Sequence, residues 1–365
     1  MDKKLIIIIL LGVSIPLVIL IFLLIGSNNN LSPSANLETC NTLEFNNDQA
    51  TNIVFFSNKD QATQYKEFFQ ETSPFDKNKE AFNFYYIDSY TPKCELYKEI
   101  AILCYSKELI KKAASCPNDY SIVLESYPSN IRSSAYENVM SINTNHQMTV
   151  LTHEFGHAFA NLAEEYTPAK LSKGSKNCVA SCDKFSYETD GCFEGCSENN
   201  YQRSISNGVM RTLSSNEYGQ LDEKLILENI KGKVSPLTGN AISNQEECAT
   251  QDYYLIEGNY NQNNINLIGR SVEQGCLGNN GVGNFIYSIK TTSGEIISES
   301  DFNPELIFTD APGENQIDGE TFVSDKNFLL KIPKITQAKS LTISENNQEL
   351  IEINLLDIGA RACKI

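Results

Sequence analysis

Two histidines four positions apart, with a glutamate directly after the first, are the residues of this sequence best suited to chemistry. They are His153, Glu154 and His157 in the largely apolar segment TVLTHEFGHAFAN, residues 149–161. On a helix, positions four apart differ by about 40° around the axis and about 6 Å along it, so both imidazoles can reach one Zn²⁺ ion. Glu154 would lie on the next face, where it can take a proton from a zinc-bound water that attacks a carbonyl. The spacing predicts a hydrolytic zinc site with Glu154 as general base.

Such a site needs a third protein ligand. The chain has only three histidines, and the remaining one, His146, precedes the helix. A carboxylate is therefore expected, and Glu164 and Glu165 follow the motif closely. On a continuing helix Glu164 would lie about 10.5 Å beyond His157, too far to share the ion. The helix should end at Asn161, which tolerates the left-handed conformation, so that Glu164 or Glu165 returns toward the metal.

Glu217 is a rival for the third ligand. It stands at the start of a helical pattern over residues 216–230 and would supply the ligand from a second helix, as in thermolysin-like enzymes. Two tyrosines near the candidate ligands, Tyr166 and Tyr218, could stabilise an oxyanion by hydrogen bonding.

The elements that must hold these residues alternate between strand and helix. Apolar runs at 52–56, 82–87, 121–124 and 138–143 predict strands, and residues 60–70 and 107–114 have helical periodicity. This alternation favours an α/β (α+β) catalytic domain, residues 46–240, with a mixed sheet covered by helices. We expect residues 138–143, directly before the site helix, to form an edge strand on which an extended peptide lies.

The C-terminal third of the chain has a different sequence pattern. Short β-rich runs alternate with Gly, Asn and Ser turns, as in 253–256, 285–289, 328–332 and 341–344. This spacing predicts an all-β, sandwich-like domain over residues 245–365. It contains no recognisable catalytic constellation, and we interpret it as a spacer or packing module.

The N-terminus predicts a membrane anchor. Leu5–Ile25 is an uncharged apolar run, about 31 Å long as a helix, which matches the hydrocarbon core of a bilayer and exceeds the apolar stretch of a secretory signal. Lysines precede it and none follows closely, so the chain after it should face outward. We expect a transmembrane signal anchor at 1–26, a polar spacer at 27–45 and a single-pass protein of the cell membrane with its catalytic domain outside.

The cysteines agree with an extracellular location. All 11 follow the apolar run, as expected in an oxidising environment where disulfides form. The group Cys178, Cys182, Cys192 and Cys196 is expected to contain at least one disulfide, and its alternative reading is a structural zinc site of four thiolates. The formal net charge of −17 opposes binding of nucleic acid through the bulk surface.

The segment HEFGHAFANLAEEY, residues 153–166, resembles the signature of the IgA-peptidase family of zinc metallopeptidases. Glu164 stands where that family has an aspartate, and Ala160 and Asn161 stand where glycine is common. Downstream, RSISNGVMR, residues 203–211, resembles the family's segment that ends in Met-Arg. The resemblance spans about residues 50–235 and implies a metzincin-like, zincin-type fold with peptide-bond hydrolysis as the reaction. It also implies that Met210 forms a turn beneath the zinc.

Together these features predict a cell-surface zinc metalloendopeptidase, a hydrolase that acts on protein or peptide substrates. A noncatalytic zincin-fold adhesin or sensor is one alternative, and a thermolysin-like peptidase with Glu217 as ligand is the other. Retention of Glu154 argues against the noncatalytic reading, because a purely structural zinc site has no use for a general base.

Overall fold

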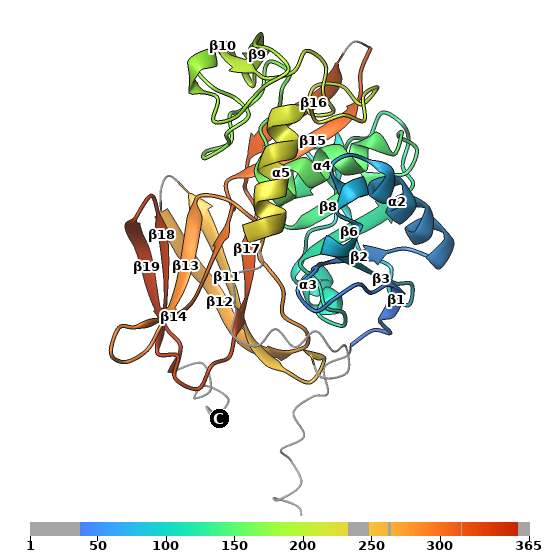
Figure 1. Ribbon diagram of the computed structural model, residues 1–365. Coiled ribbons are helices and arrows are strands. Elements are labelled where there is room, and N and C mark those ends of the chain that lie inside the picture. Colours follow the sequence, from blue (N-terminus) through green and yellow to red (C-terminus); the bar gives the residue numbers. More distant parts are fainter. Residues whose placement is uncertain (1–36, 233–247, 262–263, 315, 357–365) are drawn as a thin grey trace, which may run out of the picture. The chain divides into compact units, whose positions relative to one another are not determined.

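The centre of the fold is an eight-stranded mixed sheet (Figure 1). The computed structural model describes residues 37–232, 248–261, 264–314 and 316–356. The strand order is β1-β3-β2-β6-β8-β7-β15-β16. The strands are β1 (Asn41–Glu44), β2 (Thr51–Phe56), β3 (Phe82–Ile87), β6 (Tyr120–Glu125), β7 (Ser133–Tyr136), β8 (Val139–Asn143), β15 (Leu306–Pro312) and β16 (Ile317–Val323). The predicted mixed sheet is thus confirmed.

The parallel strands β2, β3, β6 and β8 are buried on both faces, which explains their continuous apolar sequences. On β2, Ile53 and Phe55 belong to one hydrophobic core, whereas Val54 and Phe56 belong to another. Side chains alternate along a strand, so these two cores lie on opposite faces of the sheet.

Four α-helices accompany this sheet in the described part of the chain. They are α2 (Lys59–Glu71), α3 (Lys107–Ala113), α4 (Thr149–Ala160) and α5 (Gln220–Gly232). Residues of α2, α4 and α5 pack into the first core, and residues of α3 pack into the second. Asn58 and Ser106 accept hydrogen bonds from backbone amides in the first turns of α2 and α3, which is typical of N-caps. Short 3₁₀ helices lie at Phe75–Lys77, Lys79–Ala81 and Cys182–Lys184.

The C-terminal part forms two further antiparallel sheets around a third core. One contains β11 (Asp252–Asn261), β12 (Asn264–Gln274) and β17 (Phe328–Pro333). The other contains β13 (Phe285–Lys290), β14 (Ile296–Phe302), β18 (Ser340–Glu345) and β19 (Gln348–Asn354). Two small hairpins complete the described strands, β4 (Glu95–Tyr97) with β5 (Ala101–Leu103) and β9 (Phe193–Cys196) with β10 (Glu198–Arg203).

Two expectations need correction. The C-terminal part is not a separate module, because β15 pairs with β7 and extends the central sheet through β16. Residues 138–143 do not form an edge, because β8 lies between β6 and β7. Both differences come from β7, whose sequence SSAY is short and largely small or polar and therefore carries a weak strand signal.

Five disulfides join ten of the 11 cysteines: Cys40–Cys116, Cys94–Cys104, Cys178–Cys196, Cys182–Cys192 and Cys248–Cys276. The expectation of disulfides is confirmed, and the alternative of a four-thiolate zinc site is wrong. Cys363 lies outside the described residues. Five disulfides fit an oxidising, extracellular type of environment.

The expected membrane anchor, residues 1–26, and residues 27–36 of the expected spacer lie outside the described residues. The rest of the expected spacer, residues 37–45, is not a free linker, because residues 41–44 form β1 and pair with β3. Within the part that the structure describes, no helix has both the length and the apolar character needed to cross a bilayer.

Candidate metal centre

The site is built on α4, a helix that is buried along most of its length. Phe155 and Phe159 of α4 stack on each other and pack edge-on or tilted against Phe82. The helix ends at Asn161, whose φ of 48° and ψ of 37° are left-handed, as the sequence predicted. This packing fixes the other face of α4, which carries His153 and His157.

The two imidazoles point their Nε2 atoms at the same place. Nε2 of His153 lies 3.1 Å from Nε2 of His157. Nδ1 of His153 lies 3.0 Å from the carbonyl oxygen of Val209, and Nδ1 of His157 lies 2.6 Å from that of Leu162. A carbonyl oxygen only accepts, so each Nδ1 carries a proton, and a ring that is neutral then presents its lone pair at Nε2. Burial lowers the pKa of His157 to about 4, which favours the neutral ring.

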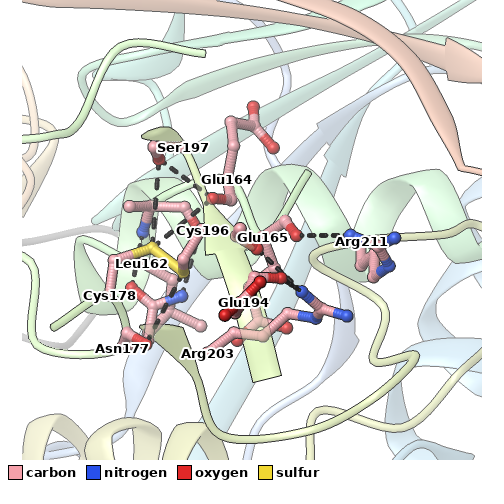
Figure 2. The surroundings of a disulfide bond; sticks show 12 residues. Leu162, Glu164, Glu165, Asn177, Cys178, Glu194, Cys196, Ser197, Arg203 and Arg211 are labelled. Carbon is pink, nitrogen blue, oxygen red and sulfur yellow. Dashed lines mark hydrogen bonds between the residues drawn. A yellow bond between two sulfur atoms is a disulfide. The ribbon is translucent and has the colours of Figure 1, made fainter. Parts of the chain in front are cut away.

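Glu164 reaches the same place from the segment after the helix. Its Oε1 lies 3.1 Å from Nε2 of His157, and its Oε2 lies 3.5 Å from Nε2 of His153. The turn at Asn161 brings it back, and Ser197 holds its backbone by donating a hydrogen bond of 2.9 Å to the Glu164 carbonyl. Figure 2 shows this segment beside the Cys178–Cys196 disulfide.

Asp310 of β15 is the fourth member of the group, and sequence reasoning missed it. Its Oδ2 lies 3.3 Å from Nε2 of His153, and its Oδ1 accepts a 2.8 Å hydrogen bond from the Tyr166 hydroxyl. Two residues earlier, Phe308 stacks on the His157 ring, with centroids 3.9 Å apart. Gly319 lies opposite Asp310 on β16, and any β-carbon there would collide with Asp310 and Tyr166. The available signal was a lone acidic residue inside the apolar strand LIFTDAP.

This group can hold a metal ion. One ligand atom from each of His153, His157, Glu164 and Asp310 lies within 4.8 Å of the others, and all four residues are buried. Both carboxylate oxygens of Glu164 and Oδ2 of Asp310 lack a hydrogen-bond partner among the described residues. Buried carboxylates facing two imidazole lone pairs are costly without a cation. The donor set therefore fits a bound metal ion.

Glu154 lies beside the group and makes no hydrogen bond through either carboxylate oxygen within the described residues. It is fully buried, and burial raises its pKa well above its usual range, with further contributions from the charges of Asp310 and Glu164. Its two carboxylate oxygens are therefore free of hydrogen-bond partners among the described residues, next to the candidate metal ligands.

Glu165 and Glu217 lie elsewhere. Glu165 is buried near Arg203, and burial raises its pKa to about 8 against the opposing effect of the Arg203 charge. The Glu165 carbonyl accepts a hydrogen bond from Arg211, and its amide donates to the Met210 carbonyl. Glu217 is exposed and is not part of the group. The third histidine, His146, is also separate and bonds through Nε2 to the Ser129 carbonyl.

The remaining predicted residues, Met210, Tyr166 and Tyr218, contact α4 or Asp310. Met210 is buried against α4, where a β-carbon added to Gly156 would meet its Sδ at 2.8 Å. Tyr218 is also buried and donates its hydroxyl to the Thr152 carbonyl, while the Tyr166 hydroxyl is bonded to Asp310. Each hydroxyl thus has a protein partner in this structure, and the oxyanion role of the two tyrosines stays a prediction.

Comparison with protein-family models and with curated protein sequences finds no match to this chain.

Proposed function

We propose that this protein is a Zn²⁺-dependent endopeptidase of the cell surface that hydrolyses peptide bonds in protein substrates. The observation that carries the proposal is the buried carboxylate of Glu154, which has no hydrogen-bond partner among the described residues. It lies beside two imidazoles whose Nε2 atoms are 3.1 Å apart. Zn²⁺ takes histidine and carboxylate ligands, whereas Ca²⁺ and Mg²⁺ prefer all-oxygen sites.

The spacing of the ligand atoms supports zinc. Atoms about 2.0–2.2 Å from a tetrahedral centre lie roughly 3.3–3.5 Å from one another. The contacts among the Nε2 atoms and the carboxylates of Glu164 and Asp310 range from 3.1 to 3.5 Å. These four contacts are compatible with a zinc site, and one ligand atom from each of the four residues lies within 4.8 Å of the others.

Each residue has a defined task in hydrolysis. When bound, zinc would polarise the scissile carbonyl and lower the pKa of the attacking water. Glu154 accepts the proton of that water and later delivers it to the leaving amine. The carbonyls of Val209 and Leu162 hold the two imidazoles in the orientation and protonation state that metal binding needs. Met210 packs against Gly156 of α4 and helps to keep the helix in place.

The noncatalytic alternative also has a specific observation in its favour. Four protein ligands close a tetrahedral zinc site, which is typical of structural sites, whereas catalytic sites leave one position for water. Asp310 is the residue that would take this fourth position when a metal ion is bound. The test must therefore examine the chain both with and without the Asp310 carboxylate.

Metal analysis and cleavage of a denatured protein test the proposal on the unmodified chain and on Asp310→Asn. We expect at least one of the two to cleave, and Glu154→Gln in the same background to keep its zinc while losing about 10²- to 10⁴-fold in rate. Glu217→Gln, at an exposed site, is the matched control and should cleave normally. Zinc-loaded protein that does not cleave in either background would overturn the proposal.

A further inference from the structure

The strand β7 is the place where an extended peptide would meet the proposed catalytic centre. Helix α4 packs against β7, and β7 runs antiparallel to β8, its neighbour in the sheet. Without β15 and β16, β7 would be the edge of the central sheet on this side. A free edge takes an additional strand through main-chain hydrogen bonds, which is a common mode of peptide recognition.

In this structure the chain's own β15 takes that place. It pairs antiparallel with β7, with Phe308 opposite Ala135, Thr309 opposite Ser134 and Asp310 opposite Ser133. These two strands lie far apart in the sequence, so the contact is not a local hairpin. β15 therefore pairs with β7 as a bound substrate peptide would, although β15 belongs to the same chain.

The side chains of β15 also fill the catalytic centre. Phe308 and Asp310 are two residues apart and share one face, where Phe308 stacks on His157 and Asp310 contacts His153. His153, Glu154, Glu164 and Asp310 are 0% exposed, and His157 is 4% exposed. Surface pockets of about 590 and 390 Å³ lie near Pro312 at the end of β15, and neither is lined by a residue of the metal group. With β15 in place, a substrate strand cannot reach Glu154.

We propose that β15 is an internal pseudosubstrate that holds the enzyme in a latent form, with Asp310 as a removable fourth metal ligand. This inference rests on the proposed peptidase function. Displacement of β15 frees the β7 edge, and an extended, unpaired segment of a protein substrate then takes the same antiparallel register. The substrate carries a carbonyl at the Asp310 position and, two residues before it, an apolar or aromatic side chain at the Phe308 position.

The outer side of β15 is suited to displacement. Its other neighbour, β16, ends the sheet order within the described residues. Arg132, just before β7, forms an ion pair of 2.8 Å with Asp318 of β16, whose side chain is 68% exposed. The Arg132 side chain is only 15% exposed, but an ion pair whose other partner is this exposed contributes little to stability. The hairpin is held by the β7 pairing, by the contacts of Phe308 and Asp310, and by burial of Leu306, Ile307 and Ile317 in the adjoining hydrophobic cores.

The substitution Thr309→Pro tests this directly in the full-length chain. Thr309 lies on the face of β15 opposite the metal group, and proline removes its amide hydrogen and disfavours a position between two strands. Val323→Pro is the matched control, because Val323 is exposed at the end of β16, away from β7. Hydrogen exchange of β7, zinc extraction by a chelator, and peptide cleavage are measured for both.

We expect Thr309→Pro to increase exchange of the β7 amides about tenfold, equivalent to about 1.4 kcal/mol. Zinc extraction and cleavage should rise in parallel, and cleavage should disappear when Glu154→Gln is added. Val323→Pro should change none of these. Unchanged β7 exchange, or unfolding of the whole protein in one step, would overturn the latency proposal.

A second variant tests the latency proposal if the Thr309→Pro protein does not fold. Ser134→Cys with Thr309→Cys places two cysteines opposite each other, where a disulfide would lock β15 onto β7. Locked protein should release zinc to a chelator more slowly than either single variant, and should not cleave even with Asp310→Asn. Cleavage at the rate of the single variants would show that β15 does not gate the site. If Thr309→Pro speeds β7 exchange but produces no cleavage, the conclusion that β15 occupies the β7 edge stands. Only the peptidase function is then contradicted.

Discussion

Oδ2 of Asp310 lies 3.3 Å from Nε2 of His153, so a strand from the C-terminal part of the chain completes a group that begins on α4. The same strand stacks Phe308 on the second imidazole. These two contacts join α4 and the residues around it to the C-terminal strands. The candidate metal centre and the C-terminal strands therefore have to be considered as one unit.

The first prediction separates the three glutamates considered as ligands. Glu164→Ala should lose most of its bound zinc, because only two imidazoles and Asp310 would remain. The loss in affinity should exceed the roughly 10- to 100-fold that removal of a residue supporting a ligand costs. Glu165→Ala and Glu217→Ala should keep their zinc, which metal analysis at equal protein concentration will show. If Glu165→Ala empties the site, our placement of the ligand is wrong.

A second prediction concerns the two buried tyrosines. Tyr166→Phe removes the 2.8 Å hydrogen bond to Asp310, so zinc affinity should fall by about 10- to 100-fold. Tyr218→Phe removes a hydrogen bond to the Thr152 carbonyl and should only lower the free energy of unfolding, by about 1 kcal/mol. Chelator competition and chemical denaturation measure the two effects. Equal zinc affinities in both variants would contradict the assigned role of Tyr166.

The parts of the site that sequence reasoning predicted are those with local signals. The histidine spacing, the stop at Asn161 and the return of a carboxylate after it all depend on residues within one short segment. Sequence alone could not choose between Glu164 and Glu165, because the direction of each side chain depends on contacts with distant residues. Glu165 lies near Arg203, and Ser197 holds the carbonyl of Glu164.

The parts that it missed depend on pairing between remote segments. Asp310 is an unfavourable residue for a strand by propensity, and its position became meaningful only through the pairing of β15 with β7. The strand order likewise follows from burial on both faces rather than from any local pattern. This is why the sequence suggests an edge strand at residues 138–143, whereas β8 lies inside the sheet between β6 and β7.

A third prediction is a pH dependence of stability from Glu137, which follows β7. The Tyr105 hydroxyl donates a 2.5 Å hydrogen bond to its Oε2, and burial raises the pKa of Glu137 to about 8. The folded pKa lies above the unfolded value of 4.5, so the stabilisation from this group is complete below pH 4.5 and is lost as the pH rises toward 8.

Glu137→Gln should remove this dependence. Between the two pKa values, each pH unit changes the free energy of unfolding by up to about 1.4 kcal/mol for one proton. Denaturation series from pH 5 to about 8 should therefore show the wild type losing stability relative to Glu137→Gln. Glu108→Gln, at an exposed position, is the control. Its free energy of unfolding should change with pH in parallel with that of the wild type. Parallel curves for both variants would refute the prediction.

The last prediction compares two disulfides in one loop. Cys178–Cys196 has a sequence separation of 18, and Cys182–Cys192 has one of 10. Loop entropy then assigns a similar stabilisation, about 3 kcal/mol, to each. Their surroundings differ, because the first bond lies directly between residues that hold the Glu164 segment, whereas the second is exposed.

Asn177 and Ser197 flank the first disulfide. Asn177 accepts a 2.8 Å hydrogen bond from the amide of Ala163 and donates one to its carbonyl, and Ser197 bonds to the carbonyl of Glu164 (Figure 2). Replacing both Cys178 and Cys196 by alanine should therefore loosen Glu164 and speed zinc extraction by a chelator about 10- to 100-fold. Replacing Cys182 and Cys192 should lower the unfolding free energy by a similar amount and leave extraction unchanged. Equal extraction rates in the two variants would mean that the Cys178–Cys196 bond stabilises the fold without positioning the metal ligand.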